Sequence, residues 1–196
     1  MVEPEGVALR LAEWAKRRRA SIAWGPAAEL CSARRAVLGL REDGLLDAVF
    51  FRDQLEPVAG EPDQLPEWAR TVIVAAVPSP AFTVAFTTSA GSVTALLPPT
   101  YVHYHRTHDA VAGEILAALG PERRVELTRG PVKTLAVRLG LASWGRNNIT
   151  YSGRLGSYHQ LVGVLSDAPL VPARRRGPAA TAGLQECDGC SSCASV

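Results

Sequence analysis

The sequence lacks the features that would place the protein in a membrane or outside the cell. No segment of its 196 residues approaches the roughly 20 consecutive apolar residues that a membrane-spanning helix requires. The N-terminus, MVEPEGVALRLAEWAKRRR, begins with acidic residues and then shows helical spacing, without the long apolar core of a secretory signal peptide. We therefore expect a soluble, cytoplasmic protein without a membrane partner.

An excess of charge of one sign is also missing, and cysteine is scarce. The formal net charge is +2, and the basic clusters at 16–19 and 174–176 are short and have few aromatic neighbours. Such clusters are typical of solvated helix ends or linkers, so we do not predict a nucleic-acid partner. The chain has four cysteines and no secretory signal, which argues against a disulfide framework. Cys31 stands alone in a predicted helix, where a thiol usually serves as a small core hydrophobe.

What is present is enough apolar material for one core, with alternating helix and strand patterns. Apolar residues at helical spacing, with proline or glycine at the ends, predict helices from Val7, over 26–35, over 101–119 and over 131–139. Apolar or alternating runs predict strands over 72–77, 123–128 and 158–166, and a hairpin around residues 89–91. We predict an α/β fold, an α+β sandwich, over residues 1–170, a linker over 171–186 and a cysteine-rich tail over 187–196.

A polar loop before the last strand concentrates groups that can bind a ligand. The stretch WGRNNITYSGRLGSYH, residues 144–159, combines glycines with amides, hydroxyls and an arginine. Glycines permit close approach of the backbone, and the amides and guanidinium offer several donors in a small volume. One interpretation is a site for a large ligand with phosphate or amide groups. The other is a well hydrogen-bonded connection in which the asparagines stabilise turns.

The tail spaces three thiols as C-x-x-C-x-x-C through Cys187, Cys190 and Cys193. This spacing opens the ferredoxin pattern, whose fourth cysteine would be residue 197. We therefore expect the start of a truncated 4Fe-4S module. Zinc held by the three thiols and a histidine, and a tail without metal, are the alternative interpretations.

The order of several motifs resembles that of the epoxyqueuosine reductase-like family of cobalamin-dependent iron–sulfur proteins. The resemblance is carried by RTVIVAAVPSP, PPTYVHYH, PVKTLAVRLGLASWGRNNITY and GSYHQLVGVLSD, followed by CDGCSSC, and it covers most of the chain after about residue 65. It implies a nitroreductase-like α/β core that holds a corrinoid near iron–sulfur clusters. In such proteins electrons pass from the clusters to cobalt, which reduces the substrate.

The resemblance also implies roles for particular residues of this chain. The positions expected along a cobalamin pocket are Lys133, Gly145, Arg146, Asn147, Asn148, Tyr151, Gly156 and Ser157. The expected cluster ligands are Cys187, Cys190 and Cys193. The tRNA-modifying enzymes have an Asp-Tyr-His stretch early in the long helix, where this chain reads YHRTHDAV, so Asp109, Tyr104 and His105 are the candidate catalytic residues. His105 and Asp109 lie one helical turn apart, within reach of each other.

Three functions are compatible with these features. The first is a cobalamin- and iron–sulfur-dependent reductase, or a fragment of one, that takes electrons from its own cluster or from an external ferredoxin or flavodoxin. The second is a non-catalytic corrinoid carrier. The third is a flavin-binding, nitroreductase-like protein, because flavin phosphate and ring also need basic, amide-rich loops.

Overall fold

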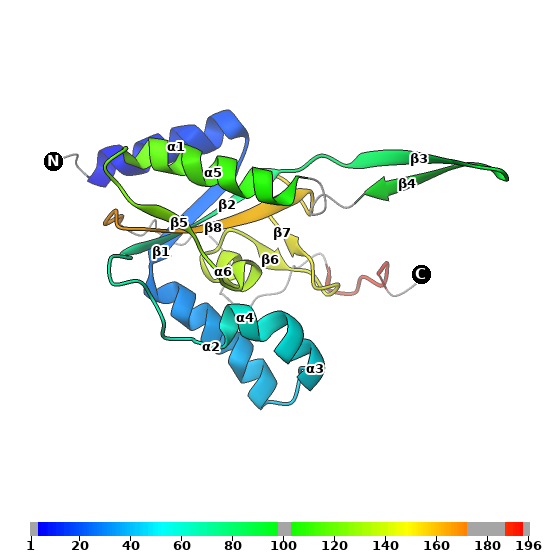
Figure 1. The fold of residues 1–196 in the computed structure, drawn as a ribbon, viewed down its shortest axis with the longest axis horizontal. Helices are drawn as coiled ribbons and strands as arrows, with labels where there is room; N and C mark the ends of the chain where they lie inside the picture. Colours follow the sequence, from blue (N-terminus) through cyan, green and yellow to red (C-terminus); the bar gives the residue numbers. More distant parts are fainter. Residues whose placement is uncertain (1–3, 98–102, 172–186, 194–196) are drawn as a thin grey trace.

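A four-stranded antiparallel sheet forms the centre of the computed structural model, which describes residues 4–97, 103–171 and 187–193. The strand order is β1-β2-β8-β5, from β1 (Ser21–Pro26), β2 (Thr71–Pro78), β8 (His159–Ser166) and β5 (Val125–Leu127). The two central strands, β2 and β8, are buried almost throughout. Helices cover both faces of the sheet (Figure 1), and this confirms the predicted mixed α/β class.

Helices α1 (Pro4–Arg18) and α5 (Tyr104–Leu119) cover one face of the sheet, where they lie side by side in Figure 1. The predicted stripe of the first helix is confirmed, because Val7, Leu11, Trp14 and Ala15 are all buried. Their partners in the core include Ile73 of β2 and Ile115 of α5, together with Val111, Val162 and Val164. The indole Nε1 of Trp14 donates to Glu114 Oε2 over 2.8 Å, which gives this buried donor its partner.

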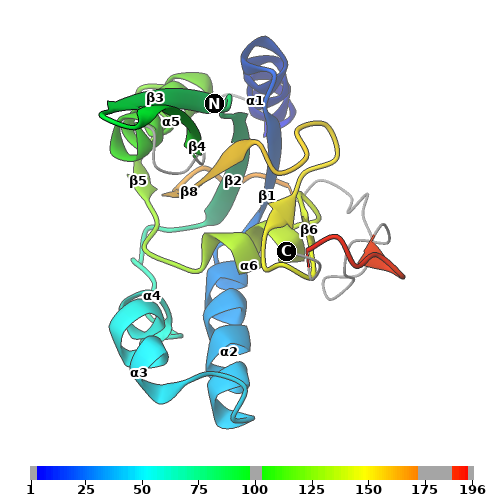
Figure 2. The same cartoon turned by 90° about the vertical axis from the view of Figure 1, so that its right-hand side faces the viewer.

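The other face of the sheet is covered by α2 (Ala28–Glu42) and α6 (Val132–Arg138), as Figure 2 shows. Leu30, Leu135 and Ala136 of these helices are buried against Val72 and Val74 of β2. The predicted stripe of the helix after Pro131 is confirmed, and Gly140 adopts φ +72° at its end, as a C-terminal cap requires. Cys31 is 6% exposed in α2, so it serves as a core residue.

The start of the second helix differs from the prediction. Pro26 does not begin that helix: it is the last residue of β1 and pairs with Thr71, and α2 begins at Ala28. Proline is tolerated there because β1 is an edge strand and Pro26 stands at its end, where no ladder donor is needed. Pro131 is likewise the residue before α6 rather than its first helical residue. The long helix α5 is described from Tyr104, and Tyr101 lies outside the described residues.

Gly163 of β8 allows α6 to approach the sheet closely. A Cβ atom built on Gly163 would lie 2.7 Å from Thr128 Cγ2 and 3.3 Å from Val132 Cγ2. Contacts under 3.0 Å are too close for carbon atoms, so a side chain here would push the segment 128–132 outward. Glycine at this position therefore sets the distance between β8 and the first turn of α6.

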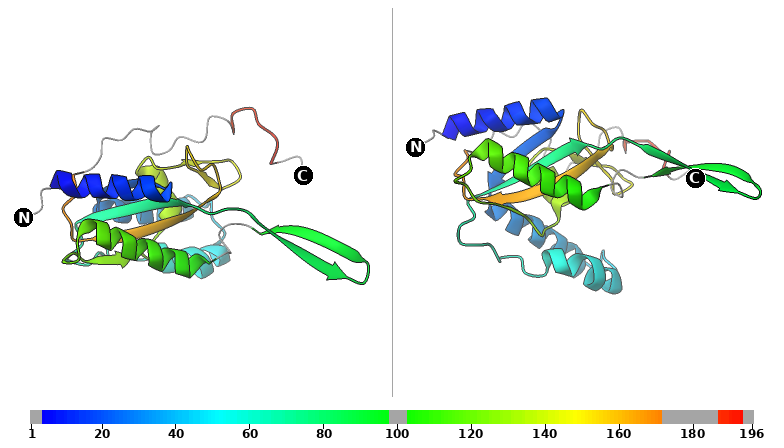
Figure 3. Two further views of the ribbon diagram at one scale, coloured as in Figure 1. Left: turned by 90° about the horizontal axis from the view of Figure 1, so that it is seen from above. Right: turned by 45° about the horizontal axis from the view of Figure 1, so that its top comes forward.

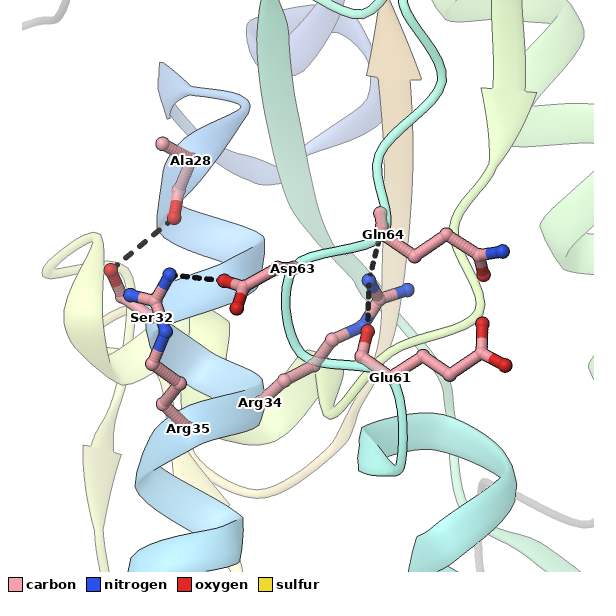
Figure 4. A network of polar contacts seen from close by, with 7 residues as sticks. All are labelled: Ala28, Ser32, Arg34, Arg35, Glu61, Asp63 and Gln64. Carbon is pink, nitrogen blue, oxygen red and sulfur yellow. Dashed lines mark hydrogen bonds and ion pairs between the residues drawn. The ribbon is translucent and has the colours of Figure 1, made fainter.

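A third group of helical turns packs against the outer part of α2. It comprises α3 (Ala48–Phe50), a π-helical turn over Phe51–Leu55 and α4 (Glu56–Ala59), with Phe51 buried at its centre. The guanidinium of Arg34 ties this region to the core, because it donates to the carbonyls of Gln64 (2.6 Å), Glu61 (3.2 Å) and Arg129 (3.0 Å). Figure 4 shows Arg34 against the loop 61–64, with the Arg35–Asp63 ion pair beside it.

The predicted hairpin is confirmed, but it lies outside the main sheet. Strands β3 (Phe82–Thr88) and β4 (Gly91–Leu97) pair with each other and form a separate two-stranded ribbon. Figure 3 shows the ribbon projecting well beyond the helices and the sheet. Most of the predicted linker, residues 172–186, lies outside the described residues. Among the described residues, no helix is long and apolar enough to cross a membrane.

Candidate cofactor-binding site

A pocket of about 530 Å³ opens at one end of the central sheet, where β8 begins. The start of β8, the first turn of α6, the strand β7 (Thr150–Tyr151), the N-terminus of α5 and the base of the hairpin all contribute to it. Its lining residues are Leu96, Tyr104, Gly130, Val132, Lys133, Ile149, Thr150, Ser157, Tyr158, His159 and Leu161. The walls are mainly aliphatic and aromatic, with a few polar groups, as in most small-molecule sites.

His159 and Thr150 are buried polar residues of this pocket, with 6% and 4% of their surface exposed. The Nδ1 of His159 lies 3.0 Å from the carbonyl oxygen of Gly156, and its Nε2 lies 3.3 Å from Thr150 Oγ1. A carbonyl can only accept, so Nδ1 carries the proton and the neutral ring accepts at Nε2 from the Thr150 hydroxyl. Burial lowers the pKa of His159, and the hydrogen bond to Gly156 opposes this effect. The ring therefore holds β7 against the start of β8 in one tautomer.

Lys133 supplies positive charge at the pocket. It lies on the first turn of α6, is exposed, and its Nζ donates to the carbonyl oxygen of Asn148 over 3.2 Å. Asn148 has a positive φ of 60°, which turns the loop at this point. One ammonium group beside apolar walls suits a ligand with a large apolar body and an anionic or amide-bearing edge.

The polar loop itself is largely bonded within itself. Asn147 Nδ2 donates to the hydroxyl of Tyr151 (3.1 Å), and its Oδ1 accepts from the backbone N–H of Ile149 (3.1 Å). Gly145 donates its N–H to the carbonyl of Ile149 (2.8 Å), and a Cβ built on it would lie 2.5 Å from Tyr151. These contacts pair β6 (Ser143–Trp144) with β7, as the second interpretation of this loop expects.

The structure thus brings together only some of the residues predicted to bind the cofactor. Lys133 and Ser157 line the pocket, and Asn148 reaches it through its carbonyl bond to Lys133. Gly145, Arg146, Asn147, Tyr151 and Gly156 are not among the lining residues of this pocket. Thr150, Tyr158 and His159 line the pocket but were not singled out as cofactor-binding residues, although they belong to the polar stretch 144–159.

The three candidate catalytic residues lie at the start of α5, at one side of the pocket. Tyr104 lines the pocket, and its ring lies 4.0 Å from the ring of His108, centroid to centroid, and 5.3 Å from that of His105. His105 and Asp109 are exposed and do not line the pocket. Burial lowers the pKa of His108, with a further decrease from the charge of His105 and an opposing increase from Asp109.

The cysteine tail lies near the polar loop. Cys187 is half-buried, and Cys190 and Cys193 are exposed. A hydrogen bond with Ser192 is the main cause that lowers the pKa of Cys190, and the nearby charge of Arg146 contributes. In Figure 2 the tail, drawn in red, runs beside β6. Among the described residues, no three histidine, cysteine or acidic side chains lie close enough to share a metal ion. As placed here, the three thiols do not fit a metal cluster.

Comparison with known proteins shows that the fold of this chain is similar to that of several solved structures. No protein-family model matches the sequence, and no curated protein matches it. Several solved structures do match: epoxyqueuosine reductase from Streptococcus thermophilus has a TM-score of 0.61 at 17% identity, over 96% of this chain and 51% of that one. The enzyme from Bacillus subtilis has a TM-score of 0.59 at 16% identity, over 97% and 53%. An epoxyqueuosine reductase bound to an epoxyqueuosine-modified tRNA stem loop has a TM-score of 0.59 at 16% identity, over 97% and 51%.

The fold therefore belongs to the mixed α/β class with an antiparallel central sheet. In particular, it is similar to about half of epoxyqueuosine reductase, since the chain spans about half the length of the solved chains it matches. This confirms the resemblance noted in the sequence.

Proposed function

We propose that this chain binds a corrinoid in the pocket at the start of β8, as the cobalamin-binding core of a reductase. One observation carries the proposal. The fold is similar to about half of epoxyqueuosine reductase, and the largely apolar pocket is lined by Lys133 and Ser157. Both residues belong to motifs that resemble the corrinoid-binding motifs of that family. The volume of about 530 Å³ lies within the range of roughly 300–1,000 Å³ typical of small-molecule sites.

The lining residues fit a macrocycle bound in part by its edge. Leu96, Val132 and Leu161 offer aliphatic surface for the ring, and Tyr104 and Tyr158 offer aromatic surface. The ammonium group of Lys133 and the hydroxyl of Ser157 can donate to peripheral amides or to a nucleotide phosphate. A bound cobalamin would supply low-valent cobalt, the reductant in this class of chemistry.

The residues of this chain contribute orientation and exclusion of water. His159 bonds to Thr150 and to the carbonyl of Gly156, so the donor groups of these two side chains are already used within the protein. Tyr104 stands at the rim with a hydroxyl that can exchange a proton with solvent or substrate. The iron–sulfur cluster stays a prediction of the sequence, and the proposed corrinoid binding does not depend on it.

A titration with hydroxocobalamin tests the proposal. We expect the corrin absorption bands to shift and to saturate at one cobalamin per chain. Lys133→Ala should weaken binding by about 3- to 10-fold, because it removes one charge-assisted contact. The chain has one other lysine, the exposed Lys16 on α1, so Lys16→Ala is a control with the same charge change and should bind as the wild type does.

Two results would contradict the proposal. One is an unchanged corrin spectrum at saturating protein. The other is a titration in which FMN binds, with a shifted flavin absorption, and hydroxocobalamin does not. The second result would favour the flavin-binding alternative for the same pocket.

A further inference from the structure

The projecting hairpin has one face that is apolar except for the pair Thr88 and Gly91 at its tip. The register pairs Phe82 with Leu97, Val84 with Ala95, and Phe86 with Val93, and residues directly opposite each other lie on the same face of an antiparallel pair. These six residues form the apolar face of the ribbon. Three of them are well exposed: Phe82 at 41%, Phe86 at 52% and Val93 at 61%. Large apolar groups gathered on one exposed face usually mark a surface that another molecule covers.

The opposite face of the ribbon is mostly polar. It carries Thr83, Thr87, Ser92 and Thr94, with Ala85 and with Leu96 at the base of the hairpin. Leu96 lines the pocket described above, so the base of this second face belongs to that pocket. The ribbon is therefore amphipathic, and its apolar face is a separate surface.

No charged side chain interrupts this part of the sequence. From Thr71 to His105 the chain has no lysine, arginine, aspartate or glutamate. Proteins commonly place such charges on exposed strands to prevent association, and these strands carry none. A two-stranded ribbon alone is at best marginally stable in water, so an apolar face of this kind needs a covering partner.

We infer that the apolar face packs against the same face of a second copy of this chain, across a two-fold axis. An uncharged surface cannot form ion pairs with a charged partner. Two copies of it can pack together without repulsion between like charges. Two-fold pairing also needs no second complementary surface, because the same patch serves both subunits.

The available area sets the strength of this contact. A fully buried aromatic side chain covers roughly 150–250 Å², so the exposed fractions of Phe82 and Phe86 leave about 100 Å² on each ring. With Val93 and its half-buried neighbours, the apolar face offers on the order of 400 Å² per copy, or about 800 Å² per pair. This is less than the roughly 1,200–2,000 Å² of a stable specific interface. The dimer is therefore weak and depends on protein concentration.

Sedimentation velocity of the full chain, over about 1 to about 200 µM, tests the inference. We expect the mean mass to rise from monomer toward dimer across this range. Phe86→Lys places a charge in the apolar face and should raise the dimer dissociation constant at least about tenfold. Thr87→Lys adds the same charge to the neighbouring residue, on the opposite face, and should change it by less than about twofold. Because the hairpin projects from the core, both variants should keep the far-ultraviolet circular dichroism of the wild type.

Three outcomes would overturn the inference. The first is a monomer at every concentration, and the second is an equal effect of the two lysine variants. The third is a wild-type monomer that co-sediments with phosphatidylcholine vesicles when Phe86→Lys does not. The hydroxocobalamin titration is independent of this contact, since Phe86 is not a pocket residue. A monomeric protein that still binds cobalamin would therefore disprove the dimer and leave the proposed function intact.

Discussion

Gly163→Ala tests the closest packing between the sheet and the helix that carries Lys133. The added methyl group would lie 2.7 Å from Thr128 Cγ2 and 3.3 to 3.5 Å from the two methyl groups of Val132. Gly163 also accepts, at its carbonyl, a 2.9 Å hydrogen bond from the N–H of Thr128. The methyl group would therefore push the segment 128–132 away from β8, although Thr128 is hydrogen-bonded to that strand.

The magnitude follows from the contacts. One extra methyl group in a tightly packed region costs about 1–3 kcal/mol, and alanine offsets a fraction of this because it reduces the conformational entropy of the unfolded chain. We expect a net loss of about 1–2 kcal/mol, which for a chain of this size corresponds to a fall in Tm of roughly 2–8 °C. Urea unfolding followed by circular dichroism would measure the change, with an unchanged slope indicating an unchanged unfolded state.

A second variant separates this packing effect from a general effect of removing glycine. Thr128→Ser deletes Cγ2, the atom that the new methyl group would meet, and keeps the hydroxyl. In the double variant, Gly163→Ala should cost at least about 0.5 kcal/mol less than it does alone, which is the size of coupling expected between contacting residues. Additive losses would refute the reasoning, and so would a Gly163→Ala protein as stable as the wild type.

Two further predictions concern stability. Burial lowers the pKa of His159 below its ordinary value of 6.5, so below about that pH the unfolded chain takes up a proton that the folded chain does not. The free energy of unfolding should therefore fall as the pH drops from 6.5 toward the lower pKa of His159 in the folded protein. His159→Asn should flatten this part of the plot of urea midpoint against pH. An unaltered plot would show that the pKa of His159 does not change on folding. Leu135→Ala should cost about 2–5 kcal/mol because Leu135 is fully buried in α6, whereas the control Leu9→Ala, on the 61% exposed Leu9 of α1, should change stability by less than about 0.5 kcal/mol in the same assay.

The fold could be predicted from the sequence wherever one local pattern decided the structure. The stripe through Val7, Leu11 and Trp14 needed only helical periodicity, and the run over 72–77 needed only a strand buried on both faces. The edge strand Ser21–Pro26 could not be found this way. Its last residue, Pro26, suits the first turn of a helix, and it ends a strand because β2 supplies the hydrogen-bonding partner. That partner lies about 50 residues away in the chain, beyond the reach of a local pattern.

The site was harder to predict because polar density does not say where the polar groups point. The loop 144–159 contributes lining residues to a pocket, but Asn147 and Tyr151 satisfy each other inside the loop. The pocket wall comes from α6, β7, β8 and the hairpin base together, so Thr150 and His159 become neighbours only through the pairing of these elements. Burial and mutual bonding of side chains are tertiary properties, and residue spacing does not encode them directly.

The self-bonded loop still has a consequence for ligand binding. The side-chain amide of Asn147 is bonded inside the loop, and the carbonyl of Asn148 accepts from the ammonium group of Lys133 at the pocket. The charge of Arg146, in the same loop, also contributes to the lowered pKa of the Cys190 thiol. The loop therefore interacts with both the pocket charge and the cysteine tail, and a change in its conformation would affect both. Internal hydrogen bonds suit the loop to this position, because they stabilise the backbone whose Asn148 carbonyl bonds Lys133 and whose Ser157 and Tyr158 line the pocket.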